Sequence, residues 1–157
     1  MILAEKLLEA ARRAGATIAT AESCTGGMIA AAITDVPGSS DMFDRGFVTY
    51  SNAAKEAMLG VTPATLAVHG AVSEDVAREM AEGALARSNA SHAVAVTGIA
   101  GPGGSESKPE GRVCFGLARK VAPTFTETVE FGAVGRAAVR RATVDHALSL
   151  LLGTIRG

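Results

Sequence analysis

The chain has 157 residues, of which 48% are hydrophobic and 4% aromatic, and its formal net charge is -1. This length allows one domain with a buried core and no disulfides or structural metal, so we expect a single domain over residues 1–157. Acidic and basic residues are interspersed, and the chain lacks the basic field that binding to a phosphate backbone requires, so nucleic acid is not an expected partner.

The N-terminal segment has the pattern of a surface helix. Apolar residues within positions 2–14 form one helical stripe, and Gly15 stands where a helix commonly ends. The segment lacks the basic start, long apolar run and cleavage site of a secretion signal, and no window approaches the length of a membrane span. We therefore expect a cytoplasmic protein that does not associate with membranes.

The elements that follow alternate between strands and helices, and abundant Ala, Val, Leu and Gly favour an α/β fold with helices packed on a sheet. We expect strands over residues 16–22, 45–51, 92–98, 112–119 and 124–132, the last two as a hairpin. Helices are expected over residues 28–34, 52–59, 74–85 and 136–152, with a single helical turn in the connector 62–70. The segment 99–111 is too rich in Gly, Pro and Ser for regular structure and is predicted to be a loop.

The cysteines and histidines form no recognised metal-binding pattern. Cys24 and Cys114 do not make a CxxC pair, and His69, His92 and His146 lack the spacing of helical metal ligands. We expect a reducing compartment and a site without metal.

The first candidate site is the turn Ser23-Cys24-Thr25-Gly26-Gly27, which joins a strand to a helix. Such a junction exposes side chains at the carboxyl end of a strand and directs backbone N–H groups towards a ligand. A serine in this position can attack a carbonyl carbon while neighbouring N–H groups hold the oxyanion. The alternative is that Ser23 and Thr25 only cap the following helix.

A nucleophilic serine needs a proton acceptor, and none of the three histidines has a local partner that would orient its ring as a base. A lysine can take this role when desolvation lowers its pKa. Lys55 is the best-placed lysine, because the strand 45–51 is expected to end beside the first strand and to bring Tyr50 and Lys55 towards Ser23. The alternatives are an ordinary exposed lysine and a boundary tyrosine, and Ser51 is a rival partner for Lys55.

A third candidate region is the glycine-rich stretch that begins at Thr97 and Gly98, where backbone could approach a ligand closely; an ordinary surface loop is the alternative. Arg136 and Arg140 lie one turn apart at the start of the last helix, where the helix dipole does not favour cations. Their presence suits an anionic ligand, although two solvated arginines are the commoner outcome.

Taken together, these segments resemble the CinA C-terminal domain family in sequence, order and spacing. The resemblance covers almost the whole chain and is carried by AESCTGG at 21–27, PGSS at 37–40, DRGFVTYSN at 44–52 with Lys55, GAVS at 70–73, VTGIAGPGG at 96–104 and KPEG at 108–111. It implies a three-layer α/β/α sandwich with a mixed, mostly parallel sheet of about five strands. The chain looks like the stand-alone form, since no residues remain for an additional N-terminal domain.

The resemblance also implies an activity, because family members are nicotinamide-nucleotide amidases that use a serine with a lysine and a tyrosine. It assigns Ser23 as nucleophile, Lys55 as general base and Tyr50 as an assisting hydroxyl, with no cofactor. The expected partner is a small nucleotide substrate, and the expected assembly is a homodimer or higher homo-oligomer.

Substrate-binding roles follow from the same matching. The residues expected to contact substrate are Cys24, Thr25, Gly26, Thr97, Gly98, Arg136 and Arg140. Arg136 is preferred over Arg140 as the phosphate ligand, although Gly135 stands where the family often has an acidic residue. Two rival hypotheses remain open, namely a Cys24-dependent amidohydrolase and a non-catalytic nucleotide-binding or assembly domain.

Overall fold

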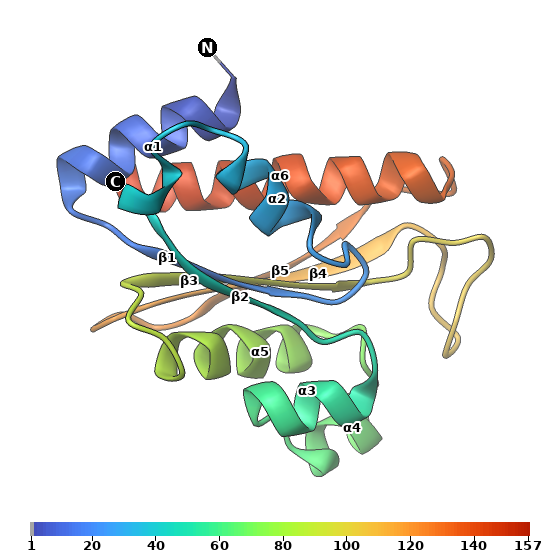
Figure 1. Ribbon diagram of the computed structural model, residues 1–157. Coiled ribbons are helices and arrows are strands. Elements are labelled where there is room, and N and C mark those ends of the chain that lie inside the picture. Colours follow the sequence, from blue (N-terminus) through green and yellow to red (C-terminus); the bar gives the residue numbers. More distant parts are fainter. Residues whose placement is uncertain (1) are drawn as a thin grey trace.

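A five-stranded sheet separates two layers of helices in the structure, a computed structural model that describes residues 2–157 (Figure 1). The strands are β1 (Ile18–Glu22), β2 (Phe43–Val48), β3 (His92–Gly98), β4 (Arg112–Arg119) and β5 (Phe125–Glu130), in the spatial order β2-β1-β3-β4-β5. One face is covered by α1 (Leu3–Ala14), α2 (Met28–Thr34) and α6 (Arg136–Arg156), and the other by α3 (Asn52–Leu59), α4 (Pro63–His69) and α5 (Glu74–Ala86). The expected three-layer α/β/α sandwich is confirmed.

The sheet is mixed. β1 pairs in parallel with β2 and with β3, whereas β4 runs antiparallel to both β3 and β5. Four of the five strands consequently point in one direction. Because β1, β2 and β3 are parallel neighbours, the segments that follow them emerge side by side at one edge of the sheet.

The two faces of the central strands carry different side chains, and this sets how closely the helices approach. In β3, Val94 and Val96 belong to the core under α1 and α6, while Ala93 and Ala95 belong to the core under α5. The small residues let α5 lie close to the sheet, and a Cβ at Gly116 of β4 would stand 2.4 Å from the carbonyl oxygen of Ala77. The alanine and glycine content noted in the sequence thus serves close helix–sheet packing.

One predicted boundary differs from the structure at the end of β2. The strand ends at Val48 instead of residue 51, because Thr49 still donates to the Glu22 carbonyl but the chain then turns into α3. Ser51 is the N-cap of α3, and its Oγ accepts a hydrogen bond from the Ala54 N–H. The Ser51 hydroxyl therefore has a capping role, and the Lys55 amine bonds to other residues.

The connector 62–70 was also underpredicted, since it contains α4, a helix of seven residues. Thr62 caps this helix by accepting from the Thr65 N–H, and Pro63 occupies the first turn, where a missing N–H has no cost. Both features were readable in the sequence. The last helix, α6, continues to Arg156, past the predicted end at 152.

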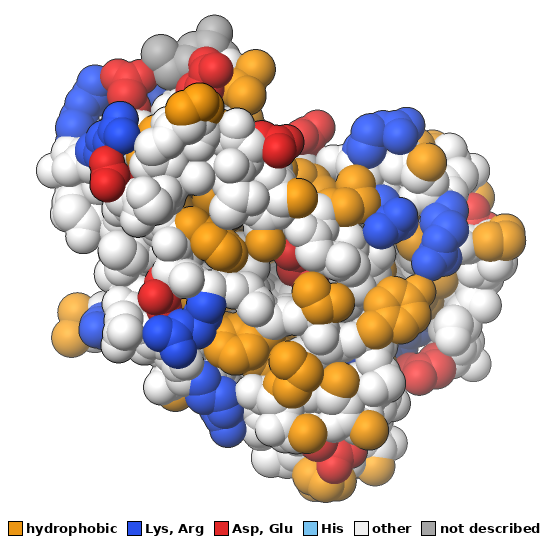
Figure 2. All heavy atoms as spheres, in the orientation of Figure 1, with side chains coloured by type: hydrophobic (Ala, Val, Ile, Leu, Met, Phe, Trp, Pro, Cys, Tyr) orange, Lys and Arg blue, Asp and Glu red, His pale blue; other side chains and the backbone are white. Residues whose placement is uncertain are grey.

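The surface facing the viewer in Figure 2 carries acidic and basic side chains in small, mixed groups, with hydrophobic side chains between them. Among the described residues, no helix combines the length and the apolar character needed to cross a membrane.

Candidate active site

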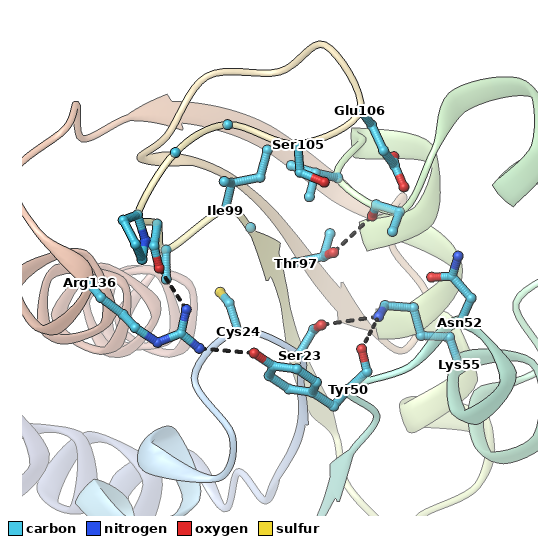
Figure 3. Close-up of a pocket in the computed structure, with 18 residues that line it drawn as sticks. Ser23, Cys24, Tyr50, Asn52, Lys55, Thr97, Ile99, Ser105, Glu106 and Arg136 are labelled. Carbon is cyan, nitrogen blue, oxygen red and sulfur yellow. Dashed lines mark hydrogen bonds between the residues drawn. The ribbon is translucent and has the colours of Figure 1, made fainter.

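A pocket of about 320 Å³ lies where the chain leaves β1, β2 and β3 (Figure 3). Its volume is within the range of roughly 300–1,000 Å³ that is usual for small-molecule sites. The lining residues come from the β1–α2 turn, the β2–α3 segment, the residues before α5 and the β3–β4 loop, with Arg136 from α6. The parallel arrangement of the three strands therefore brings together segments that are far apart in sequence.

Ser23 and Lys55 meet at the base of this pocket. Lys55 Nζ lies 3.0 Å from Ser23 Oγ, which confirms the expected proximity of the two groups. Both residues are buried, with exposed fractions of 8% for Ser23 and 1% for Lys55. A lysine side chain that is almost fully buried without a carboxylate partner is unusual, and the alternative of an ordinary exposed lysine is wrong.

The other contacts of Lys55 explain how its amine can act as a base. Nζ donates to the backbone carbonyl oxygens of Thr49, at 3.1 Å, and Tyr50, at 3.2 Å. A neutral amine has two N–H groups and one lone pair, so the two carbonyls leave the lone pair for the Ser23 hydroxyl. Burial lowers the pKa of Lys55 from its ordinary value, and nearby Cys24 and Glu106 oppose this only in part. Burial thus shifts the amine towards its uncharged form.

The side chains of Ser23 and Thr25 do not cap α2, so the alternative of a purely capping role for them is wrong. Gly27 is the N-cap of α2, and no side chain caps this helix from that position. Instead, the buried carboxylate of Glu22 accepts from the N–H groups of Ile29 and Ala30, at 2.9 and 3.0 Å. Thr25 Oγ1 also donates to Glu22, at 2.5 Å. The Ser23 hydroxyl is therefore not engaged by the helix.

Cys24 lines the pocket beside Ser23 (Figure 3). The side chain is buried, and burial raises the pKa of its thiol to about 11. Near neutral pH the thiol is almost entirely protonated, and the thiolate is the nucleophilic form of cysteine. These properties disfavour the Cys24-dependent hypothesis.

Tyr50 reaches the pocket differently from the sequence-based expectation. The residue is 61% exposed, and its hydroxyl accepts a hydrogen bond from Arg136 Nη2 at 2.9 Å. Arg136 Nη1 also donates to the Gly101 carbonyl, at 2.7 Å, so the guanidinium bridges the β2–α3 segment and the β3–β4 loop at the pocket mouth. The group of Tyr50 that contacts Lys55 is its backbone carbonyl, whereas its hydroxyl faces Arg136.

The second arginine has other partners. Arg140 donates from Nε to the Cys24 carbonyl, at 3.1 Å, and from Nη2 to the Thr25 carbonyl, at 3.2 Å. Arg140, Thr25 and Gly26 are not among the residues that line the pocket. Of the two expected anion-binding arginines, the structure therefore places only Arg136 at the pocket.

Thr97 and Gly98 form the opposite wall, at the end of β3. Thr97 is buried and donates from Oγ1 to the Ala71 carbonyl at 2.8 Å, which ties β3 to the segment before α5. A Cβ at Gly98 would lie 2.7 Å from a methyl group of Val113, so close packing against β4 requires glycine. In the loop beyond, Lys108 Nζ donates to the carbonyls of His69 and Val72, which anchors this loop at the pocket rim.

Sequence reasoning missed four polar residues of the site. Asn52, Ser105 and Glu106 line the pocket, and Glu22 supports the β1–α2 turn from below. Glu22 is the one charged residue of the buried strand β1, and its charge at the strand end could have marked it in the sequence. No comparable signal marked Glu106, because it lies in a loop whose course depends on the anchor at Lys108.

The histidines have partners outside this pocket. His69 lies 3.4 Å from Asp75, His92 contacts Ser91, and His146 contacts Glu127. Within residues 2–157, no group of three or more His, Cys, Asp or Glu side chains is arranged to hold a metal ion.

Comparison with known proteins gives one consistent family. The model of the CinA C-terminal domain matches residues 1–155. Nicotinamide-nucleotide amidohydrolase PncC of Escherichia coli (strain K12) is 53% identical over 152 residues, which covers 96% of this chain and 92% of that protein. A putative competence-damage inducible protein of Symbiobacterium thermophilum is 54% identical over 146 residues, covering 87% of this chain and 34% of that protein.

A solved structure agrees with these sequence matches. The crystal structure of competence/damage inducible protein CihA from Agrobacterium tumefaciens matches with a TM-score of 0.93 and 49% identity, over 96% of this chain and 92% of that one. The chain belongs to the CinA C-terminal domain family.

Proposed function

We propose that this protein is an amidohydrolase that converts nicotinamide mononucleotide to nicotinic acid mononucleotide and ammonia. The observation that carries the proposal is the 3.0 Å contact between Ser23 Oγ and the buried amine of Lys55. The name of the Escherichia coli relative, nicotinamide-nucleotide amidohydrolase, supports the choice of substrate.

In the first step, Ser23 Oγ attacks the carboxamide carbon. The Oγ–C bond forms while the hydroxyl proton moves to the lone pair of Lys55 Nζ, and the carbonyl oxygen becomes an oxyanion. The N–H groups of Cys24 and Thr25 are the proposed donors to this oxyanion, because both follow the nucleophile directly. No backbone carbonyl in the part of the chain described accepts from either N–H group.

In the second step, the C–N bond breaks and Lys55 returns its proton to the leaving nitrogen, so that ammonia departs and a nicotinoyl ester remains on Ser23. Water then attacks this ester, with Lys55 accepting a proton from the water and passing it to the Ser23 oxygen as the C–O bond breaks. The products are the free serine and the carboxylic acid.

Substrate recognition is assigned to the pocket mouth. Arg136 carries a fork of N–H donors that matches a phosphate group, and its present partners are neutral oxygens of Tyr50 and Gly101. A phosphate dianion is a stronger acceptor than either, so Arg136 is the proposed phosphate ligand. Release of the Tyr50 hydroxyl from Arg136 would free it to bind the substrate.

The direct test is incubation of purified protein with nicotinamide mononucleotide, with ammonia and the acid product measured together. Ser23→Ala and Lys55→Met are each expected to lower turnover by about a thousandfold or more, since loss of a catalytic-unit member has effects of this size. Thermal unfolding of each variant checks that the fold is retained. Turnover by folded Ser23→Ala would contradict the proposal, and substrate binding without turnover by the wild type would support a non-catalytic binding domain instead.

A further inference from the structure

Arg140 of α6 contacts the β1–α2 turn, which carries the proposed nucleophile Ser23. In sequence, Arg140 lies 115 residues from Thr25, one of its partners in this turn. Its guanidinium spans two successive backbone carbonyls, with Nε 3.1 Å from the Cys24 oxygen and Nη2 3.2 Å from the Thr25 oxygen. The side chain is partly buried, and one side of Gly26 also faces it, since a Cβ at that glycine would lie 3.5 Å from Nη2. The fork of Arg140 is therefore engaged with the backbone of the turn.

Glu22 holds the same turn through different groups. This carboxylate is 1% exposed and accepts three hydrogen bonds, from the Thr25 hydroxyl and from the N–H groups of Ile29 and Ala30. The Thr25 carbonyl thus accepts from Arg140 and from the Met28 N–H, and the Thr25 hydroxyl donates to Glu22. Side chains of Arg and Glu restrain a turn more than uncharged partners would, because hydrogen bonds to charged groups are stronger.

These contacts determine which way the peptide groups of the turn face. In a trans peptide the C=O and N–H bonds point in opposite directions. Because Arg140 binds the Cys24 carbonyl, the Thr25 N–H of the same peptide group points away from Arg140. The Ser23 carbonyl accepts from the Gly26 N–H at 3.1 Å, which fixes the preceding peptide group and its Cys24 N–H in the same manner.

We propose that Arg140 is a positioning residue which, together with Glu22, keeps the Cys24 and Thr25 peptide groups oriented so that their N–H groups stay available to the oxyanion. This inference rests on the proposed function, because it requires a reaction in which Ser23 generates an oxyanion. A rotation of the Cys24–Thr25 peptide group would break the bond to Arg140 and remove one of the two donors.

The position of Arg140 argues against two other roles, which are binding of the substrate phosphate and anchoring of α6. Arg136, one turn earlier, lines the pocket, whereas Arg140 does not. The packing of α6 depends on its buried apolar side chains, which are Val139, Val144, Ala147, Leu148, Leu151 and Leu152. The helix therefore has its own anchor, and the two hydrogen bonds of Arg140 act on the turn alone.

The first test compares Arg140→Ala and Arg140→Lys with the matched control Arg141→Ala, an exposed neighbour on the same helix. Arg140→Ala is expected to lower kcat for nicotinamide mononucleotide by about tenfold to a hundredfold, somewhat less than direct loss of an oxyanion donor. Arg140→Lys should fall between Arg140→Ala and wild type, because an ammonium keeps the charge without the fork. KM is expected to stay within about threefold of wild type in all variants, since the ligand-binding groups are untouched.

A second readout does not depend on the substrate. A fluorophosphonate probe reacts with serine nucleophiles, with Ser23 Oγ bonding to phosphorus, fluoride leaving and the hydroxyl proton passing to Lys55. The N–H groups of Cys24 and Thr25 would stabilise the negative charge that develops on the phosphoryl oxygen, as they are proposed to do for the oxyanion of the amide. Arg140→Ala should react about tenfold or more slowly than wild type, whereas Arg141→Ala should react at the wild-type rate.

The two readouts separate the inference from the function on which it rests. If the wild type releases no ammonia but reacts with the probe, the proposed function fails and the probe still tests Arg140. A raised KM with unchanged kcat in Arg140→Ala would overturn the inference and make Arg140 a substrate ligand. Wild-type rates in both assays for a folded Arg140→Ala would overturn it as well. Should Arg140→Ala not fold, Arg140→Lys takes its place in both assays, and wild-type rates in that variant would equally overturn the inference.

Discussion

The β1–α2 turn and the β3–β4 loop both contain glycines and both follow a parallel strand, yet they are held in different ways. In the turn, Ser23, Cys24 and Thr25 are at most 8% exposed; Glu22 binds Thr25, and Arg140 binds the carbonyls of Cys24 and Thr25. In the loop, residues 102–107 are all exposed, and the main anchor is Lys108 at its far end. The comparison teaches that the groups near the reacting atoms are fixed by buried charges, while the groups at the pocket mouth are held by a few replaceable contacts.

The dependence of activity on pH tests the turn side of this comparison, with a large expected effect. Lys55 must be neutral to accept a proton, and burial lowers its pKa from 10.5. Below the pKa of Lys55, kcat/KM should fall about tenfold for each pH unit, which is a hundredfold over two units. The rate of Ser23 phosphonylation should follow the same acid limb. A pH profile that is flat through the acid range would contradict the proposal that Lys55 is the general base.

The same pKa shift predicts a dependence of stability on pH. Between the lowered pKa of folded Lys55 and 10.5, the unfolded chain binds more protons than the folded one, so the free energy of unfolding rises with pH in this window. The unfavourable contribution is fully present below the folded pKa and disappears as the pH approaches 10.5. Urea unfolding across this pH range should show this rise in the free energy of unfolding for the wild type and not for Lys55→Met.

Glu22→Gln tests the anchor beneath the turn. The buried carboxylate accepts from one hydroxyl and two N–H groups, and an amide nitrogen placed in the same position repels at least one of these donors. The free energy of unfolding should fall by about 2 kcal/mol or more, since hydrogen bonds to charged groups are individually worth about 1.5–3 kcal/mol. kcat should fall while KM is retained.

Glu56→Gln is the control for this change, because Glu56 is exposed on α3 and its carboxylate makes no hydrogen bond or ion pair within the described chain. Urea unfolding of the two variants in parallel gives the measurement. Equal stabilities for Glu22→Gln and Glu56→Gln would show that the turn does not depend on the buried charge.

Arg136→Ala tests the pocket mouth and should have a smaller effect of a different kind. The variant loses the proposed phosphate ligand, so KM for nicotinamide mononucleotide should rise about tenfold, equivalent to about 1.4 kcal/mol, with a smaller change in kcat. Nicotinamide itself, which lacks the phosphate, is the control substrate, and any slow turnover of it should be insensitive to the substitution. A fall in kcat at constant KM would instead show that Arg136 acts on the chemical step, as the residues of the β1–α2 turn are proposed to do.

Most elements and the proximity of Ser23 and Lys55 could be predicted from the sequence because local patterns define them. β3 was predicted with its observed bounds, since an apolar run between a polar start and a glycine-rich stretch leaves few alternatives. The proximity of Ser23 and Lys55 followed from two adjacent strand ends. By contrast, the contacts of Arg136 with Tyr50 and of Arg140 with the turn join segments 86 and 115 residues apart. The direction of each arginine depends on how α6 packs on the sheet, which no local pattern specifies.

Cys24→Ala should have the smallest effect and tests the remaining rival nucleophile. Its thiol is protonated near neutral pH because burial raises its pKa to about 11, and its proposed contribution comes from the backbone N–H, which alanine keeps. Turnover within about threefold of wild type is therefore expected, with a modest loss of stability from the lost side-chain packing. Cys114→Ala, a second buried cysteine outside the pocket, controls for general effects of losing a thiol. If Cys24→Ala were inactive while Ser23→Ala retained turnover, the nucleophile would be the cysteine, and the fixed geometry of the turn would have to be explained around its sulfur.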